Sequence, residues 1–113
     1  MRTAARITVY GSSEHDEQKA LMDWAALRAG RYPELALLFA IPNGGKRDPV
    51  TAARLRDEGV KPGVPDLCLP VARQGWHGLF IELKYGRNKP SEYQLDWLIR
   101  LTEQGYLAVV AWG

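Results

Sequence analysis

An aspartate, a glutamate and a lysine are the residues of this sequence whose types and spacing best suit catalysis. Glu82 lies sixteen positions after Asp66, and Lys84 stands two positions beyond Glu82. Side chains alternate across a β-strand, so Glu82 and Lys84 would project from the same face of a strand. Paired strands lie about 4.8 Å apart, so pairing of the two segments would bring Asp66 and Glu82 together near the strand ends.

Two carboxylates at this range predict a divalent-cation site, because they repel each other and a cation allows both to stay ionised. Oxygen ligands suit Mg²⁺ or Mn²⁺, and the carbonyl of Leu83 is a further candidate ligand. Such an ion activates a bound water, while Lys84 orients or helps to deprotonate that water and stabilises the transition state. The set predicts phosphodiester hydrolysis. The alternative is that Glu82 and Lys84 form a surface pair on the solvent side of a strand.

The segment that follows two serines offers a third acid. Ser12 or Ser13 can cap a helix that begins near Glu14. Either Glu14 or Glu17 could reach the metal site, although acidic residues in a first turn also stabilise the helix dipole. Gln18 lies one turn beyond Glu14 on the same helix face.

Gln94 is a further candidate near the start of the last expected helix. It follows the loop after Lys84, so its side chain could reach a ligand or the nucleophilic water. Ser91 and Gln94 also have the spacing of a capping box, and the two roles are compatible.

Helices and strands must alternate along the chain to position these residues. We expect helices, each with a capping residue at its start and a glycine close to its end, over residues 14–29, 48–58 and 91–104. Short apolar runs predict strands over residues 35–41, 66–71, 78–84 and 106–112, the second and third forming a hairpin. The expected core stripe of the last helix is Leu95, Leu98, Ile99 and Thr102. The order α-β-α-β-β-α-β predicts an α/β fold, a mixed β-sheet flanked by helices, in one domain over residues 1–113.

The composition is that of an ordinary globular domain, with 46% apolar and 25% charged residues. No apolar run approaches the roughly 20 residues that span a bilayer, and the N-terminus lacks the apolar stretch of a signal peptide. Cys68, the single cysteine, is expected to be a small buried hydrophobe. One cysteine and two histidines give no zinc-ligand cluster. We therefore expect a cytoplasmic protein.

Basic residues gather in two loop-rich stretches, although the net charge of +2 is too small to indicate nucleic-acid binding by itself. One stretch runs from Lys46 to Lys61 and the other from Lys84 to Lys89. Such loops suit phosphate contacts, and glycine allows a backbone to approach closely; a solvated basic surface is the alternative. The candidates for DNA binding are Asn43, Gly44, Gly45, Lys46, Arg47, Lys61, Arg87 and Lys89.

Four short motifs, in their order and spacing, resemble the VRR-NUC domain, a branch of the PD-(D/E)XK nuclease superfamily. They are Pro42-Asn43-Gly44-Gly45, Gly63-Val64-Pro65-Asp66-Leu67, Ile81-Glu82-Leu83-Lys84 and Ser91-Glu92-Tyr93-Gln94. The resemblance runs from about residue 14 to residue 113 and implies a restriction-endonuclease-like α/β core with a metal site.

The resemblance also implies roles for individual residues. Asp66 and Glu82 correspond to metal ligands, and Lys84 corresponds to the catalytic lysine. Glu14, rather than Glu17, corresponds to the helix-borne acid of an E-x-x-x-Q pattern that Gln18 completes. Gln94 matches the glutamine that follows the E-x-K strand.

Stand-alone relatives of this size occur in bacteria and bacteriophages, and short members are homodimers that resemble Holliday-junction resolvases. We therefore expect a metal-dependent endonuclease that resolves four-way DNA junctions as a homodimer, in the cytoplasm of a bacterium or a phage-infected cell. Two-fold symmetry would place the two cuts that a symmetrical junction needs. Longer relatives are expected to continue with another helix after Trp112-Gly113.

Three other functions fit the same fold. A flap- or end-processing nuclease, or a nicking nuclease, would use the same residues, so the motifs do not separate these from a resolvase. A non-catalytic DNA-binding module is disfavoured, because Asp66, Glu82 and Lys84 are all present.

Overall fold

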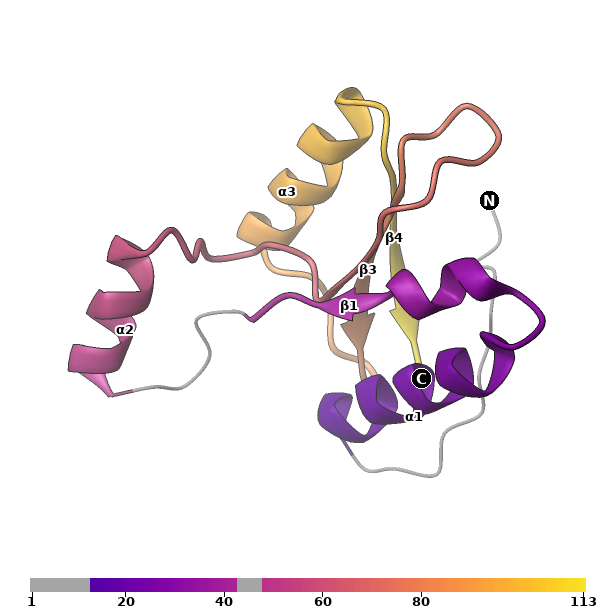
Figure 1. Ribbon diagram of the computed structural model, residues 1–113. Helices are drawn as coiled ribbons and strands as arrows, with labels where there is room; N and C mark the ends of the chain where they lie inside the picture. The colour runs from indigo at the N-terminus through magenta and orange to yellow at the C-terminus, as the bar shows by residue number, and fades with distance from the viewer. Residues whose placement is uncertain (1–12, 43–47) are drawn as a thin grey trace.

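The computed structural model describes residues 13–42 and 48–113, which form a four-stranded sheet with helices packed against it (Figure 1). The strands, in their order across the sheet, are β1 (Phe39–Ala40), β2 (Leu67–Leu69), β3 (Leu79–Lys84) and β4 (Leu107–Trp112). The helices are α1 (Glu14–Arg28), the short 3₁₀ helix η1 (Pro33–Leu37), α2 (Pro49–Asp57) and α3 (Glu92–Glu103).

The sheet is mixed, as predicted. β2 pairs antiparallel with β1 on one side and with β3 on the other, whereas β3 pairs parallel with β4. A parallel pair needs a crossover connection, and α3 supplies it. The predicted α/β fold and its α-β-α-β-β-α-β order are confirmed, with η1 as an additional short element.

The core lies between α1 and one face of β2 and β3. Ser13 caps α1 by accepting a hydrogen bond from the backbone of Asp16, and the buried Ala25 packs against the sheet. From the sheet, Leu67 and Leu83 are 0% and 5% exposed and join the same cluster. Because Leu83 turns toward this core, its neighbours along β3 turn toward the opposite face.

The strand expected over residues 35–41 is largely wrong. The chain forms η1 there, and β1 has only two residues, both exposed. Proline fixes its own φ and favours the first turn of a helix, so Pro33 starts a helical turn. Of the apolar run, Leu38 is buried, whereas Leu37 is 52% and Phe39 47% exposed.

The core stripe expected on α3 is wrong by one position. Leu95 and Ile99 are 46% and 59% exposed, Thr102 is also exposed, and Leu98 alone of the four is buried. The less exposed face consists of Gln94, Trp97, Leu98 and Leu101. Two contacts determine which face of α3 is covered. The helix packs on the edge strand β4, and the indole N–H of Trp97 donates to the carbonyl of Pro62 at 3.0 Å.

Helix α2 projects away from the other elements (Figure 1) and has no buried residue. Its start is nevertheless well defined, because Asp48 accepts a hydrogen bond from the backbone of Thr51 at 2.9 Å. Among the helices in the described part of the chain, none is long and apolar enough to cross a membrane.

Candidate active site

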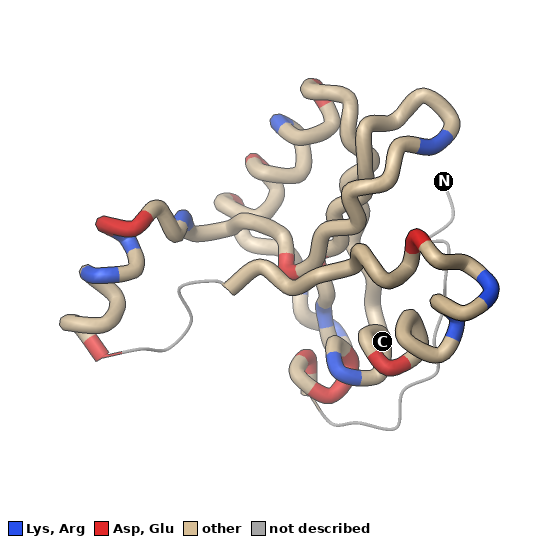
Figure 2. The backbone as a smooth tube through the Cα atoms, viewed as in Figure 1, with Lys and Arg blue, Asp and Glu red and all other residues tan. Residues whose placement is uncertain are grey.

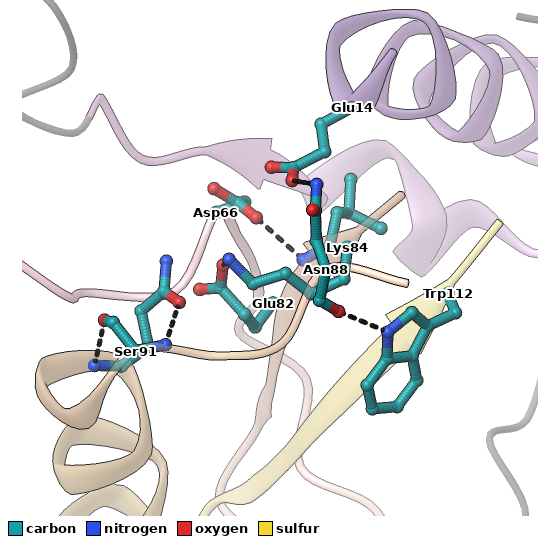
Figure 3. Close-up of polar contacts among 9 residues, drawn as sticks. Glu14, Asp66, Glu82, Lys84, Asn88, Ser91 and Trp112 are labelled. Carbon is teal, nitrogen blue, oxygen red and sulfur yellow. Dashed lines mark hydrogen bonds and ion pairs between the residues drawn. The ribbon is translucent and has the colours of Figure 1, made fainter. Parts of the chain in front are cut away.

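Asp66 and Glu82 lie side by side, as the sequence predicts. Leu67 pairs with Ile81, and the antiparallel register extended by one position sets Asp66 opposite Glu82. The backbone N–H of Leu83 donates a hydrogen bond of 2.7 Å to Asp66 Oδ2 (Figure 3). The loop residue Asp66 is therefore fixed against β3. The structure shows the N–H of Leu83, rather than its carbonyl, in contact with this carboxylate.

Glu82 and Lys84 form a buried ion pair beside Asp66. Lys84 Nζ lies 3.5 Å from Glu82 Oε2, and the two side chains are only 9% and 1% exposed. This burial excludes the solvent-exposed surface pair that was the alternative for these residues. Glu82 Oε1 is buried and has no hydrogen-bond partner among the residues that the structure describes. Burying an unpaired carboxylate oxygen is costly, so binding a cation or a hydrogen-bond donor at this atom would be favourable.

Asp66 and Glu82 are two neighbouring carboxylates, one half-buried and the other buried. Burial and the negative charge of Asp66 raise the pKa of Glu82 to about 8, although Lys84 opposes the rise. Burial also raises the pKa of Asp66, and the charge of Glu14 adds to it, while the Leu83 N–H acts in the opposite direction. A divalent cation would favour the ionised form of both groups.

The donor set fits a cation that is held partly by water. Within residues 13–42 and 48–113, no three Asp, Glu, His or Cys side chains gather closely enough to form a metal cluster by themselves. Mg²⁺ keeps several waters and is commonly bound through one or two carboxylates. Asp66 and Glu82, of which Glu82 has an oxygen without a hydrogen-bond partner among the described residues, fit this pattern, with water for the remaining ligand positions.

Of the two acids at the start of α1, Glu14 is directed toward the site. The first turn of this helix is acidic (Figure 2), and the charge of Glu14 acts on Asp66. Glu17 is 4% exposed. Its carboxylate lies so close to Gly113 that a Cβ atom on residue 113 would collide with it. Burial and repulsion from Glu14 raise the pKa of Glu17. The partly buried Gln18 lies one position further along α1.

Gln94 forms the capping box that was one of its two predicted roles. Its Oε1 accepts a hydrogen bond from the backbone of Ser91 at 2.8 Å, and Ser91 Oγ accepts one from the backbone of Gln94 at 3.2 Å (Figure 3). The box places Gln94 at the start of α3, on the less exposed face of that helix.

Two residues that the sequence analysis did not single out also belong to this region. The amide of Asn88 donates to Glu14 Oε2 at 3.5 Å, and the indole N–H of Trp112 donates to the carbonyl of Asn88 at 2.9 Å. Asn88 stands between glycine, proline and basic residues, where asparagine usually indicates a turn. Only the fold reveals that α1 and β4 meet at this loop.

The candidates for DNA binding fall into two groups. Lys61, Arg87 and Lys89 are exposed, the last two in the loop that directly follows Lys84. Asn43, Gly44, Gly45, Lys46 and Arg47 lie outside the described residues.

A separate cavity of about 430 Å³ lies at the other end of the β2–β3 hairpin. Its lining includes Trp24, Trp76 and Leu79, and none of the candidate catalytic residues contributes to it. The candidate active site is thus at the end of β3 that carries Lys84.

Comparisons with known proteins agree with this geometry. A family model described as the VRR-NUC domain matches residues 12–113. A solved structure named "VRR_NUC domain protein" is 31% identical in sequence, with a TM-score of 0.76, and the match covers 93% of this chain and 81% of that one. No curated protein matches. The matched residues include all the described side chains of the candidate active site.

Proposed function

Because this chain belongs to the VRR-NUC family, whose domain is that of a PD-(D/E)XK-type nuclease, we propose that it is a divalent-cation-dependent endonuclease that cuts branched DNA. The observation that carries this proposal is the half-buried Asp66 beside the buried Glu82, with Lys84 Nζ 3.5 Å from Glu82. Family membership accounts for the nuclease fold and for DNA as the substrate. Cation dependence and the preferred DNA structure are the parts that need experiments.

In this proposal Asp66 and Glu82 hold Mg²⁺ or Mn²⁺, with the carbonyl of Leu83 as a further ligand. When bound, the ion neutralises charge on the phosphate and lowers the pKa of a bound water. Glu14 contributes a third acid from α1, reaching the ion directly or through water.

Lys84 and Gln94 act on the reacting groups. The ammonium of Lys84 lies in a buried position, where it stabilises negative charge on the phosphate more effectively than it would in water. Its ammonium also orients the attacking water. Gln94, which the capping box fixes at the start of α3, contacts the phosphate or that water in this proposal.

DNA is held through its backbone. Arg87 and Lys89 are exposed beside the site, and Lys61 is exposed beyond α2, so all three are free to meet phosphates. Residues 43–47, which lie outside the described residues, stay candidates for DNA binding from the sequence alone. Contacts of this kind position a duplex without reading its bases, so we expect selectivity for DNA structure rather than for sequence.

We propose that the preferred branched substrate is a four-way junction and that the protein acts as a homodimer. One 113-residue nuclease unit provides a single active site, whereas a symmetrical junction needs two cuts related by a two-fold axis. The setting would be the cytoplasm of a bacterium or a phage-infected cell. A flap- or end-processing role, a nicking role and a non-catalytic DNA-binding role are the alternatives that the following experiment separates.

The test is to offer the purified protein labelled four-way junction, 5′ flap, splayed and linear duplex DNA of matched sequence, with Mg²⁺, Mn²⁺ or a chelator. We expect paired symmetrical cuts in the junction, with either cation, and no cutting with the chelator. Faster cutting of the flap would favour the end-processing alternative. Linear duplex cut as fast as the junction would refute structure selectivity, and cutting in the chelator would refute cation dependence.

A further inference from the structure

Asn88 joins three parts of the chain beside the candidate active site. Its side-chain Nδ2 donates to Glu14 Oε2 at 3.5 Å, and its backbone carbonyl accepts from the indole of Trp112 at 2.9 Å (Figure 3). The start of α1, the end of β4 and the loop between β3 and α3 therefore meet at one residue. That loop starts directly after Lys84.

Local geometry fixes the backbone of Asn88 without help from its side chain. The chain reverses at Gly86, which has a φ of 62°, and the N–H of Asn88 donates to the carbonyl of Tyr85 at 3.2 Å. Trp112 pairs with Lys84 across the parallel strands, so the two side chains leave the same face of the sheet. The indole then holds the Asn88 carbonyl, and the amide is left to contact Glu14.

The contact to Glu14 matters because Glu14 comes from α1, whereas Asp66 precedes β2. Figure 3 shows both carboxylates at the end of β3 that carries Lys84, so the orientation of Glu14 bears on the Asp66–Glu82 pair. An amide N–H bonded to one oxygen of Glu14 restrains that side chain and leaves its other oxygen available. A distance of 3.5 Å marks a weak bond, which restrains the side chain without locking it.

We infer that Asn88 is a positioning residue, whose amide orients Glu14 toward the Asp66–Glu82 pair. This inference rests on the proposed cation site and adds to it a residue that touches neither cation nor DNA. Hydrogen-bond partners that orient metal-binding carboxylates commonly change metal affinity by about 10- to 100-fold. Because the contact is long and exposed, we expect an effect at the lower end of this range.

The chain offers a clean way to remove this contact alone. Asn88→Ala deletes the amide but keeps the backbone carbonyl that Trp112 contacts, so the loop should keep its attachment to β4. The probe is Mn²⁺ without DNA, with binding measured by the electron paramagnetic resonance of the free ion. Asn88→Ala should weaken Mn²⁺ binding by about tenfold, whereas Gln104→Ala, an exposed change at the far end of α3, should leave it unchanged. Thermal unfolding followed by circular dichroism checks that each variant is folded.

A double-mutant cycle with Glu14→Ala tests whether Asn88 acts through Glu14. In that background Asn88→Ala should have no further effect, because there is no carboxylate left to orient. Equal losses in both backgrounds, or no loss in the wild-type background, would overturn the inference. If the wild-type protein binds no Mn²⁺, or if Glu82→Gln binds it as well as wild type, the proposed cation site itself is wrong and this inference fails with it.

Discussion

Leu83 and Asp66 are joined by a hydrogen bond that crosses from β3 to the residue preceding β2, from the backbone N–H of Leu83 to Asp66 Oδ2 at 2.7 Å. Leu83 is 5% exposed and belongs to the core, so the bond attaches a candidate catalytic carboxylate to a strand that is anchored in the core. Asp66 therefore has two roles, one structural and one electrostatic. One oxygen accepts from the backbone, and its charge acts on Glu82.

The structural and electrostatic roles of Asp66 can be separated by substitution. Asp66→Asn keeps an oxygen acceptor for the Leu83 N–H, so we expect a folded protein of near-normal stability whose cleavage rate falls by at least about 100-fold. Asp66→Ala leaves a buried N–H without a partner and should lower the free energy of unfolding by roughly 1–3 kcal/mol as well. Urea unfolding and junction cleavage measure the two effects. Equal stability of the two variants would mean that the hydrogen bond contributes nothing.

Glu82 should make stability depend on pH. The pKa of Glu82 is raised from 4.5 to about 8 in the folded protein. Between these two pH values, Glu82 is therefore protonated in the folded state and already ionised in the unfolded state. The stabilisation is complete below the unfolded pKa and is lost as pH rises through the folded pKa. In the presence of a chelator, the free energy of unfolding should thus fall as the pH is raised from about 5 to about 8, by on the order of a few kcal/mol.

Glu82→Gln is the control for this pH dependence, because it removes the titrating group and keeps nearly the same volume. Its unfolding free energy should change less over the same pH range. If wild type and Glu82→Gln show the same pH dependence, Glu82 is not the group responsible. A divalent cation binds the ionised pair, so the stabilisation that Mn²⁺ provides should increase with pH over this range.

Lys84 should be needed for the chemistry more than for the fold. Lys84→Met keeps the unbranched shape and most of the length of the side chain and removes its charge, so we expect junction cleavage to fall by at least about 100-fold while junction binding persists. Without the ammonium, which lowers the pKa of Glu82, that pKa should rise further.

The matched control for Lys84 is Lys19→Ala. Lys19 also forms an ion pair, with Asp23 at 2.8 Å, but both side chains are well exposed on α1. Exposed pairs contribute little, so this variant should keep its cleavage rate and its stability. Cleavage at the wild-type rate by Lys84→Met would exclude Lys84 from the active site.

Local signals in the sequence predicted the framework of this site well. Ser13 and Ser91 are helix caps whose hydrogen bonds are fixed by spacing along the chain, and both caps are present. The alternation of β3 placed Glu82 and Lys84 on one face, and the hairpin placed Asp66 beside them. These relationships depend on neighbours in sequence or on one short connection.

Relationships that depend on distant packing were not predictable in the same way. The stripe of α3 is shifted by one residue because the edge strand β4 and the loop at Pro62 determine which side of the helix is covered. Glu14 and Glu17 are equivalent as first-turn acids by local pattern, and the fold separates them: Glu17 lies against Gly113, whereas Glu14 contacts Asn88. The contact between Asn88 and Glu14 joins residues 74 positions apart, and no local pattern reports it.

Arg87 and Lys89 should contribute to DNA affinity through phosphates alone. Each exposed cation that neutralises a phosphate releases a counterion, so Arg87→Ala and Lys89→Ala should each reduce the slope of log affinity against log salt by about 1. Fluorescence anisotropy in a chelator, at several salt concentrations and on junctions of two unrelated sequences, measures this slope without cleavage. The loss should be the same for both sequences, because phosphate contacts carry no base information.

The control for these two variants is Arg73→Ala. Arg73 is exposed and pairs with Glu34 at 3.3 Å, at the end of the hairpin that faces away from the candidate active site. Its removal takes away the same charge from the protein, so a general effect of net charge would appear equally in all three variants. An unchanged slope for Arg73→Ala, with reduced slopes for Arg87→Ala and Lys89→Ala, would place the DNA backbone along the loop that follows β3. Equal slopes in all four proteins would remove this loop from the DNA-binding surface.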